Sequence, residues 1–278
     1  MKLSIITINR NNVSGLEKTL KSVTAQTCKD FEHIIIDGAS TDNSVEVIKQ
    51  YVENTLNPSP NPHHQIRWIS EPDKGIYNAM NKGIRMASGE YIQILNSADC
   101  LCDEFVVEKM LKALADNEYP SLLYGNMIKV ASDGRIVGKS GRVEYSLRQY
   151  YSSTMNHDCC YIKRSLFDDY GYYDESLKIV SDWKWFMEAI GFGKVKPVYV
   201  NQDVTLFDTT GISETNLDLR YKERRKVLEH VVPKAILADY DKHAFDMDQM
   251  DRLRRHKWAY KMTWFLERCL FKLEKWKR

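Results

Sequence analysis

Short apolar runs alternate with segments of helical periodicity through residues 3–95 of the chain. Four runs, at residues 3–8, 32–37, 66–70 and 91–95, are rich in Ile and are closed by polar residues, which predicts strands, the first of them buried. Between them, apolar residues recur three or four positions apart in three sets: Leu16, Leu20 and Val23; Val45, Ile48 and Val52; Ile76, Met80, Ile84 and Ala87. Such strand–helix repeats predict an α/β fold with a parallel sheet, helices on both faces and right-handed crossovers.

The pattern changes from about residue 120 onward. Residues 122–130 and 135–138 predict a strand pair around the turn Ser132-Asp133-Gly134. A strand at 160–162, a helix near 183–190 and a strand at 195–200 are expected to follow. This half therefore reads as mixed rather than parallel.

Polar residues gather where the first four predicted strands end. The first strand ends at Thr7-Ile8-Asn9, the second at Asp37, the third at Glu71-Pro72-Asp73-Lys74 and the fourth at Asn96-Ser97-Ala98-Asp99. Open parallel sheets bind ligands at the carboxyl ends of their strands, where these loops meet. The sequence therefore predicts one acidic edge, with an Asp in three of its four loops.

That edge lacks the usual phosphate-binding loops. There is no G-x-G-x-x-G and no G-x-x-x-x-G-K-[ST] in the chain, which argues against dinucleotide oxidoreductases and P-loop enzymes. An acidic edge repels a diphosphate unless a divalent cation lies between them, and Mg²⁺ or Mn²⁺ prefers carboxylate ligands. Asp99 is the candidate ligand, although an Asp after a strand is more often a cap or loop residue.

Five ordered segments resemble family 2 glycosyltransferases of the GT-A fold. They are I-I-T-I-N-R-N, I-I-I-D-G-A-S-T-D-N-S, S-E-P-D-K-G-I-Y-N-A-M-N-K-G-I, G-E-Y-I-Q-I-L-N-S-A-D and R-S-L-F-D-D-Y-G-Y-Y-D-E-S-L-K-I-V-S-D-W-K-W-F. Together they span roughly residues 3–212. The resemblance implies a Rossmann-type nucleotide-diphospho-sugar transferase domain over residues 1–212, followed by a helical C-terminal extension at 213–278.

The resemblance also implies a role for individual residues. Nucleotide and donor contacts are expected from Thr7, Asn9 and Asp37 (nucleobase and ribose, commonly of UDP), from Asp73 and Lys74, and from Ser97 and Asp99. Asp99 matches the last acid of the family's Asp-x-Asp metal motif, which implies a divalent Mn²⁺ or Mg²⁺ cofactor. Asp182 matches the catalytic base of inverting members, with the N-terminus of a helix as the structural alternative. His157 is expected either at the acceptor or diphosphate, or in a purely structural role.

Three departures from the family pattern refine this picture. Ser97 replaces the first acid of the metal motif, and Ser181 precedes the base where many relatives have an acid. No Q-x-x-R-W follows Asp182, which favours a single-transfer enzyme over a processive synthase. In such an enzyme Asp182 takes the proton of the attacking hydroxyl, and attack opposite the leaving group inverts the anomeric centre.

Charge is distributed unevenly along the chain. The net charge is only +2, yet residues 252–278 carry ten Lys or Arg against Glu267 and Glu274. Apolar residues recur there at steps of three or four: Trp258, Met262, Phe265, Cys269, Leu273 and Trp276. This pattern predicts a basic amphipathic helix that lies on a membrane surface, or one that packs on the catalytic domain or a second subunit. Nucleic acid is not an expected partner, because no recognised binding module is present.

Compartment and partners follow from weaker signals. The apolar N-terminal run is too short for a signal peptide, no segment approaches the ~18 apolar residues of a membrane span, and the six cysteines lack zinc-ligand spacing. A cytoplasmic protein with reduced thiols is expected, peripheral at the inner face of the cell membrane if the tail binds there.

The leading hypothesis is a glycosyltransferase of surface polysaccharide biosynthesis, which uses a nucleotide-sugar donor and a glycan or lipid-linked acceptor. A catalytically weak nucleotide-sugar binding protein, recruited to membranes by its basic tail, is the alternative. A nucleotidyltransferase is disfavoured because it needs a basic glycine-rich loop near the N-terminus. The sequence leaves a homo-oligomer open.

Overall fold

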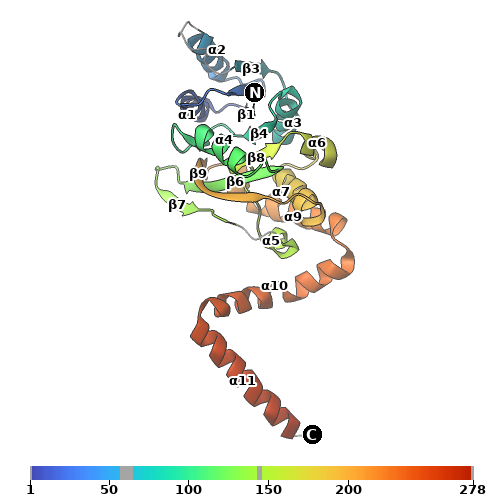
Figure 1. Ribbon diagram of the computed structural model, residues 1–278. Coiled ribbons are helices and arrows are strands. Elements are labelled where there is room, and N and C mark those ends of the chain that lie inside the picture. Colours follow the sequence, from blue (N-terminus) through green and yellow to red (C-terminus); the bar gives the residue numbers. More distant parts are fainter. Residues whose placement is uncertain (1, 57–64, 143–145, 277–278) are drawn as a thin grey trace. The chain divides into compact units, whose positions relative to one another are not determined.

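The predicted alternation of strands and helices is present in the computed structural model, which describes residues 2–56, 65–142 and 146–276 (Figure 1). The first half contains, in order, β1 (Leu3–Asn9), α1 (Val13–Thr24), β2 (Phe31–Asp37), α2 (Ser44–Leu56), β3 (Gln65–Ser70), α3 (Ile76–Met86) and β4 (Tyr91–Ile94). The four strands and three helices predicted from residues 3–95 are therefore confirmed.

The second half is richer than its sequence pattern indicated. It contains β5 (Cys100–Leu101), α4 (Val106–Asp116), β6 (Leu122–Val130), β7 (Ile136–Lys139), α5 (Leu147–Ser152), a 3₁₀ turn (His157–Cys159), β8 (Cys160–Lys163), α6 (Ser165–Tyr170), α7 (Ser181–Phe186), a π-helical turn (Met187–Phe192), β9 (Val198–Asp208), α8 (Ile212–Thr215) and α9 (Leu217–Val231). The strand pair at 122–138 is confirmed, with Gly134 at a φ of 84° in its turn.

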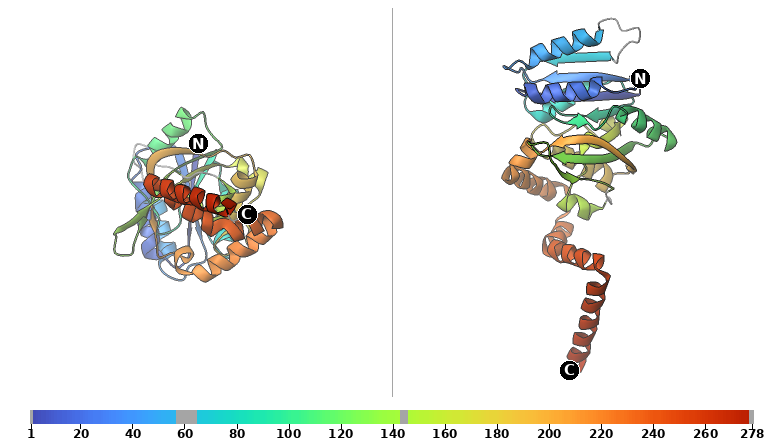
Figure 2. Two further views of the ribbon diagram at one scale, coloured as in Figure 1. Left: turned by 90° about the horizontal axis from the view of Figure 1, so that it is seen from below. Right: turned by 90° about the vertical axis from the view of Figure 1, so that its left-hand side faces the viewer.

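These strands form one sheet in the order β3-β2-β1-β4-β8-β6-β9-β5, with β7 paired to β6. The right-hand view of Figure 2 follows it from the blue strands to the green and orange ones. The first four strands are parallel, whereas β8 runs antiparallel to both β4 and β6. The register pairs Asn9 with Asp37, so the polar ends of β1 and β2 lie at the same edge.

Helices cover both faces of the parallel half because successive strand residues point to opposite sides. Ile35 of β2 packs with Leu16 of α1 and Ile48 of α2. The next residue, Ile36, faces α3, where a Cβ on Gly83 would lie 3.4 Å from its side chain. The runs of β1, β2 and β4 are therefore buried on both faces, as covered parallel strands require, whereas β3 at the edge of the sheet is only partly buried.

The last strand differs from its prediction. The expected strand at 195–200 is displaced and longer, because β9 continues through the polar run Asn201-Gln202-Asp203 to Asp208. That run pairs with β6 across a register shift, where the buried side chain of Asn126 donates to Asp203 at 2.8 Å and to Asn201 at 3.1 Å. These hydrogen bonds let a turn-like sequence remain in the sheet.

The same irregularity requires a glycine. A Cβ on Gly125 would lie 2.5 Å from the carbonyl oxygen of Gln202 and 2.5 Å from a methyl group of Val204. Gly125→Ala is therefore expected to destabilise the protein by ~2 kcal/mol, since overpacking costs about that much. A thermal melt should show a Tm lower by several degrees. Gly138→Ala in β7 is the control, because its Cβ would come no closer than 3.8 Å to another side chain. Equal melting temperatures for the two variants would contradict this account.

The chain divides into two compact units, one ending at Arg224 and one beginning at Arg225. The division expected at residue 212 thus falls before the structural boundary, and residues 213–224 belong to the first unit. The second unit contains the end of α9, α10 (Lys234–Arg255) and α11 (Lys257–Trp276), with Arg225 bound by both oxygens of Asp241 at 2.8 Å.

Large apolar side chains on α11 are exposed to solvent: Trp258, Met262, Trp264, Phe265, Leu266, Leu270 and Phe271. The side chains of Leu273 and Trp276, predicted to extend this surface, lie outside the described part. Among the residues that the structure describes, no helix is long and apolar enough to cross a membrane. All six cysteines are free.

Candidate functional site

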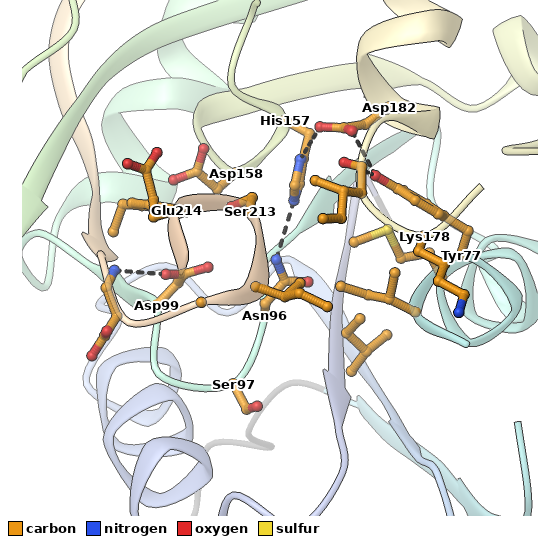
Figure 3. A pocket seen from close by; sticks show the side chains of 18 of the residues that line it. Tyr77, Asn96, Ser97, Asp99, His157, Asp158, Lys178, Asp182, Ser213 and Glu214 are labelled. Carbon is orange, nitrogen blue, oxygen red and sulfur yellow. Dashed lines mark hydrogen bonds and ion pairs between the residues drawn. The ribbon is translucent and has the colours of Figure 1, made fainter. Parts of the chain in front are cut away.

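A cavity of about 610 Å³ lies at the carboxyl ends of β1 and β4 and is lined only by residues of the first unit. Its other walls come from residues 73–80 at the start of α3, the segment before β8, the residues that lead into α7 and its start, and residues 207–224. Figure 3 shows Asp99, His157, Asp158 and Asp182 gathered around it. The volume is within the usual range of ligand sites, about 300–1,000 Å³.

The cavity brings together six of the nine residues predicted for the site. Asn9, Asp73, Ser97, Asp99, His157 and Asp182 line it, whereas Thr7, Asp37 and Lys74 do not. Thr7 is buried, with its hydroxyl 2.9 Å from Nε2 of His33. Lys74 is exposed, and its backbone N–H donates to Asn78 at the start of α3.

Asp37 lies behind the cavity and holds Asn9 at its edge. The Asp37 carboxylate accepts hydrogen bonds from the side chains of Asn9, Ser40 and Ser70 and from the Ser40 backbone. Burial opposes the charge, but these donors outweigh it and lower the pKa of Asp37. Because Asp37 does not line the cavity and its hydrogen-bonded neighbour Asn9 does, Asp37 reaches the cavity through Asn9 rather than directly.

Glycine at position 38 brings Asp73 close to this edge. A Cβ there would lie 2.1 Å from the Asp73 carboxylate, so only glycine leaves the space. Asp73 also accepts from the backbone N–H of Gly75 at 2.9 Å and lies 3.8 Å from the guanidinium of Arg10. Arg10, which also lines the cavity, thus supplies positive charge beside two acidic loops.

Asp99 is held by a strained turn. Ala98 adopts a φ of 88°, a region that costs a non-glycine residue about 1–3 kcal/mol. The hydroxyl of Thr19 in α1 accepts from the Ala98 N–H at 3.0 Å and donates to the Asp99 carbonyl at 2.7 Å. These bonds fix the direction of the Asp99 side chain, which accepts from the backbone N–H of Asp208 at 2.9 Å.

The surroundings of Asp99 are deficient in positive charge. Only 4% of Asp99 is exposed, and burial together with the negative charge of Asp158 raises its pKa well above the usual value. Within the described residues, no group of three or more His, Cys, Asp or Glu side chains is arranged to hold a metal ion. The donor set instead fits a divalent cation bound by Asp99 and completed by oxygens of a ligand, as Mg²⁺ often is.

Asp182 lies in the first turn of α7, and both of its carboxylate oxygens have partners. Oδ2 accepts from Nδ1 of His157 at 2.9 Å, and Oδ1 accepts from the hydroxyl of Tyr77 at 2.8 Å (Figure 3). The second ring nitrogen of His157 lies 3.2 Å from the side-chain amide of Asn96. Four residues from four separate segments thus form one continuous chain of hydrogen bonds.

The charges of this pair follow from its contacts. Burial is the largest influence on His157 and lowers its pKa, but the hydrogen bond and charge of Asp182 outweigh it and raise the pKa to about 9. Burial likewise opposes the charge of Asp182, yet the donors His157 and Tyr77 lower its pKa. The pair is therefore an imidazolium and a carboxylate at neutral pH. An imidazolium donates from Nε2 as well, so the Asn96 amide then turns its oxygen, which is otherwise unpaired, toward His157.

Residues 210–214 line the cavity on the side of Asp99 and are fixed by two cations. Lys129 of β6 pairs with Glu214 at 2.9 Å, and Arg220 of α9 donates to the Ser213 carbonyl at 2.8 Å. Both cations also line the cavity, and both lie within ion-pair distance of Glu214, with Arg220 at 3.9 Å.

Sequence reasoning missed several of these residues. Tyr77 falls on the apolar face of a predicted helix, where an aromatic residue suggests core packing. Asn96 belongs to the polar loop after the fourth strand, but nothing near it indicates a partner beyond residue 150. Asp158 follows His157 directly, which is a signal that could have been used.

Known proteins resemble this chain in sequence and in fold. The family model described as glycosyl transferase family 2 matches residues 4–171. An uncharacterized glycosyltransferase of Mycobacterium tuberculosis is 33% identical over 214 residues, which cover 76% of each chain.

Two solved structures show the same fold at low sequence identity. Staphylococcus aureus TarS in complex with UDP-GlcNAc has a TM-score of 0.57 and 20% identity over 75% of this chain and 58% of its own. The mannosyltransferase PcManGT of Pyrobaculum calidifontis, in complex with GDP-Man and Mn²⁺, has a TM-score of 0.55 and 17% identity over 74% of this chain and 56% of its own. The expected GT-A-like α/β fold is thus confirmed, and with a family match over more than half of its length the chain belongs to glycosyl transferase family 2.

Proposed function

We propose that this glycosyltransferase moves a sugar from a nucleoside-diphosphate donor, a UDP-sugar, to a hydroxyl of a glycan or glycolipid with inversion, in surface polysaccharide biosynthesis. The observation that carries the proposal is an ionised carboxylate, Asp182, held in the same cavity as the buried Asp99. A base for the acceptor and an anchor for the diphosphate are the two groups that direct displacement needs. The UDP-GlcNAc complex of TarS supports the choice of donor class.

Asp182 acts on the acceptor. Its lowered pKa keeps the carboxylate ionised at neutral pH. The carboxylate has four lone pairs and accepts from His157, Tyr77 and the Trp183 backbone, so one lone pair remains to take the proton of an acceptor hydroxyl. As that proton moves to Asp182, the hydroxyl oxygen bonds to the anomeric carbon and the bond from this carbon to the diphosphate oxygen breaks. Attack opposite the leaving group converts an α-linked donor into a β-glycoside.

The opposite side of the cavity receives the leaving group. A divalent cation bound by Asp99 would supply positive charge to the diphosphate, and the Mn²⁺ complex of PcManGT supports this assignment. Thr19 fixes the turn that aims Asp99, while Lys129 and Arg220 add fixed positive charge to the cavity wall. Asn9 and Asp73, at the ends of β1 and β3, are proposed to contact the nucleoside.

The test uses the full chain with a panel of UDP-, GDP-, CDP- and dTDP-sugars, with and without Mn²⁺. Binding is measured by calorimetry, and turnover by release of the nucleoside diphosphate. Metal-dependent binding and turnover of one donor is the expected result. Binding without turnover, with any acceptor, would favour the catalytically weak binding protein instead. No binding in either condition would overturn the assignment of the cavity.

We further propose that α11 attaches the enzyme to an anionic lipid surface, where a lipid-linked acceptor resides. Its exposed apolar side chains include Trp258, Met262 and Phe265, which lie three or four positions apart. Lys257, Lys261 and Arg268 lie beside this stripe on the helix, and all three are exposed. An amphipathic helix with a basic border and Trp on its apolar face has the composition of a membrane-surface helix.

Removing two apolar anchors should release the chain from vesicles. The full chain is expected to co-sediment with vesicles that contain phosphatidylglycerol, less so at high salt, because screening weakens the basic contacts. The double variant W258E/F265E should lose at least ~10-fold in its partition onto vesicles. Burying one large apolar side chain contributes about 1.5–3 kcal/mol to binding, and a tenfold change corresponds to about 1.4 kcal/mol. Ile136→Glu is the matched control, because Ile136 of β7 is 68% exposed and Trp258 is 69% exposed. Equal binding by both variants would contradict the proposal.

A further inference from the structure

Two buried tyrosines lie side by side, of which only Tyr77 lines the cavity, and their hydroxyl groups differ in their partners. Tyr77 is 4% exposed and Tyr173 is 3% exposed, and their ring centroids are 5.6 Å apart. The Tyr77 hydroxyl lies 2.8 Å from Oδ1 of Asp182 and 2.6 Å from the Ile179 carbonyl. Within the described part of the chain, the Tyr173 hydroxyl has no hydrogen-bond partner.

The Tyr77 hydroxyl stays a donor under all ordinary conditions. Burial, and then the negative charge of Asp182, raise its pKa well above the usual value. Its single proton is shared between two acceptors, of which the carboxylate is charged and therefore the stronger. The neighbouring backbone carbonyl fixes the position of the hydroxyl, because Ile179 lies in the segment that leads into α7.

The two ends of the Asp182 carboxylate are thereby held from opposite sides. Tyr77 comes from the first turn of α3, and His157 comes from the 3₁₀ turn before β8. Figure 3 shows the two side chains on either side of the carboxylate. With a donor on each oxygen, rotation of the carboxylate plane breaks at least one hydrogen bond. Such second contacts orient a reacting group without touching the substrate.

We propose that Tyr77 is a positioning residue for the transfer reaction: its hydroxyl, with His157, sets the plane of the Asp182 carboxylate for the acceptor hydroxyl. The inference rests on the proposed function, because it assigns a role within the same site. The proposal predicts an effect on the rate of the chemical step and none on the affinity for the donor, since the Tyr77 hydroxyl contacts Asp182 and a backbone carbonyl.

The pair of tyrosines provides its own control. Tyr77→Phe and Tyr173→Phe each remove one oxygen from neighbouring buried rings. Tyr77→Phe is expected to lower kcat roughly 10- to 100-fold, as small misplacements of a reacting group do. The donor Kd should not change. The acid limb of the kcat/KM profile should move to higher pH, because the lost hydrogen bond raises the pKa of Asp182. Tyr173→Phe should match the wild type in all three.

Further measurements separate positioning from folding. Thermal melts and donor titrations establish that both variants are folded and bind. Incorporation of 3-fluorotyrosine at position 77, which keeps the hydroxyl, should restore kcat. The proposal is overturned if Tyr77→Phe keeps the kcat of Tyr173→Phe, or if it loses donor affinity instead. A wild-type enzyme that transfers no sugar would overturn the proposed function, which is a different result.

Discussion

Asp182→Asn should lower kcat by roughly 10²–10⁴-fold, the usual contribution of a general base. The substitution keeps the size of the side chain, and an amide oxygen can still accept from His157 or Tyr77, but an amide cannot take the acceptor proton. Because the proposed nucleoside contacts are Asn9 and Asp73 rather than Asp182, donor affinity should stay close to that of the wild type. Single-turnover assays with the identified donor and acceptor measure the first quantity, and calorimetry the second.

A matched change elsewhere shows whether the effect belongs to the site. Asp169→Asn makes the same chemical change at an exposed residue of α6 that does not line the cavity. It should leave kcat and donor affinity unaltered. If Asp182→Asn retains most of its activity, another group takes the acceptor proton. A large loss of donor affinity would show that Asp182 serves the donor rather than the acceptor.

Much of the fold could be predicted from local pattern. The Ile-rich runs are the strands β1 to β4. Of these, β1, β2 and β4 are buried, because a parallel strand covered on both faces has no polar face to interrupt it, whereas the edge strand β3 is partly exposed. The extent of β9 could not be predicted in this way. Its run Asn201-Gln202-Asp203 resembles a turn, and only the buried Asn126, 75 residues earlier, explains why it stays in the sheet. Helix α4 was missed although Val106, Met110 and Leu114 have helical spacing and are buried.

Some residues of the site could likewise be predicted from the sequence, and others could not. Strand ends identified Asn9, Asp73 and Asp99, because the topology of a parallel sheet brings them to one edge. The positions of the strand ends could not show that Thr7 and Asp37 do not line the cavity, since that depends on which side chain each one binds. Tyr77 carries no distinguishing signal in sequence, because a Tyr on the buried face of a helix is ordinary core packing. The role proposed for Tyr77 depends on one hydrogen bond to Asp182, which lies 105 positions later in the chain.

Asp99→Asn should separate function from stability. Its pKa is raised well above the usual value by burial and by the charge of Asp158. An acid whose pKa is higher in the folded protein than in the unfolded chain loses stability as pH rises above its unfolded value. At neutral pH and without metal, the Asn variant should therefore melt at the same temperature as the wild type or higher, and its amide oxygen can still accept from the Asp208 N–H.

Asp99→Asn should also abolish the effect of the metal ion on binding of the donor nucleotide. Calorimetry with the preferred nucleotide is expected to show Mn²⁺-dependent binding for the wild type and at least ~10-fold weaker binding for Asp99→Asn, a loss of about 1.4 kcal/mol. Asp116→Asn, at an exposed ion pair of α4, is the control and should bind as the wild type does. Donor binding that responds to Mn²⁺ equally in all three proteins would remove Asp99 from the metal site. A variant that is stable but has lost its response to metal would assign Asp99 to the diphosphate, because no loss of folding could then explain the result.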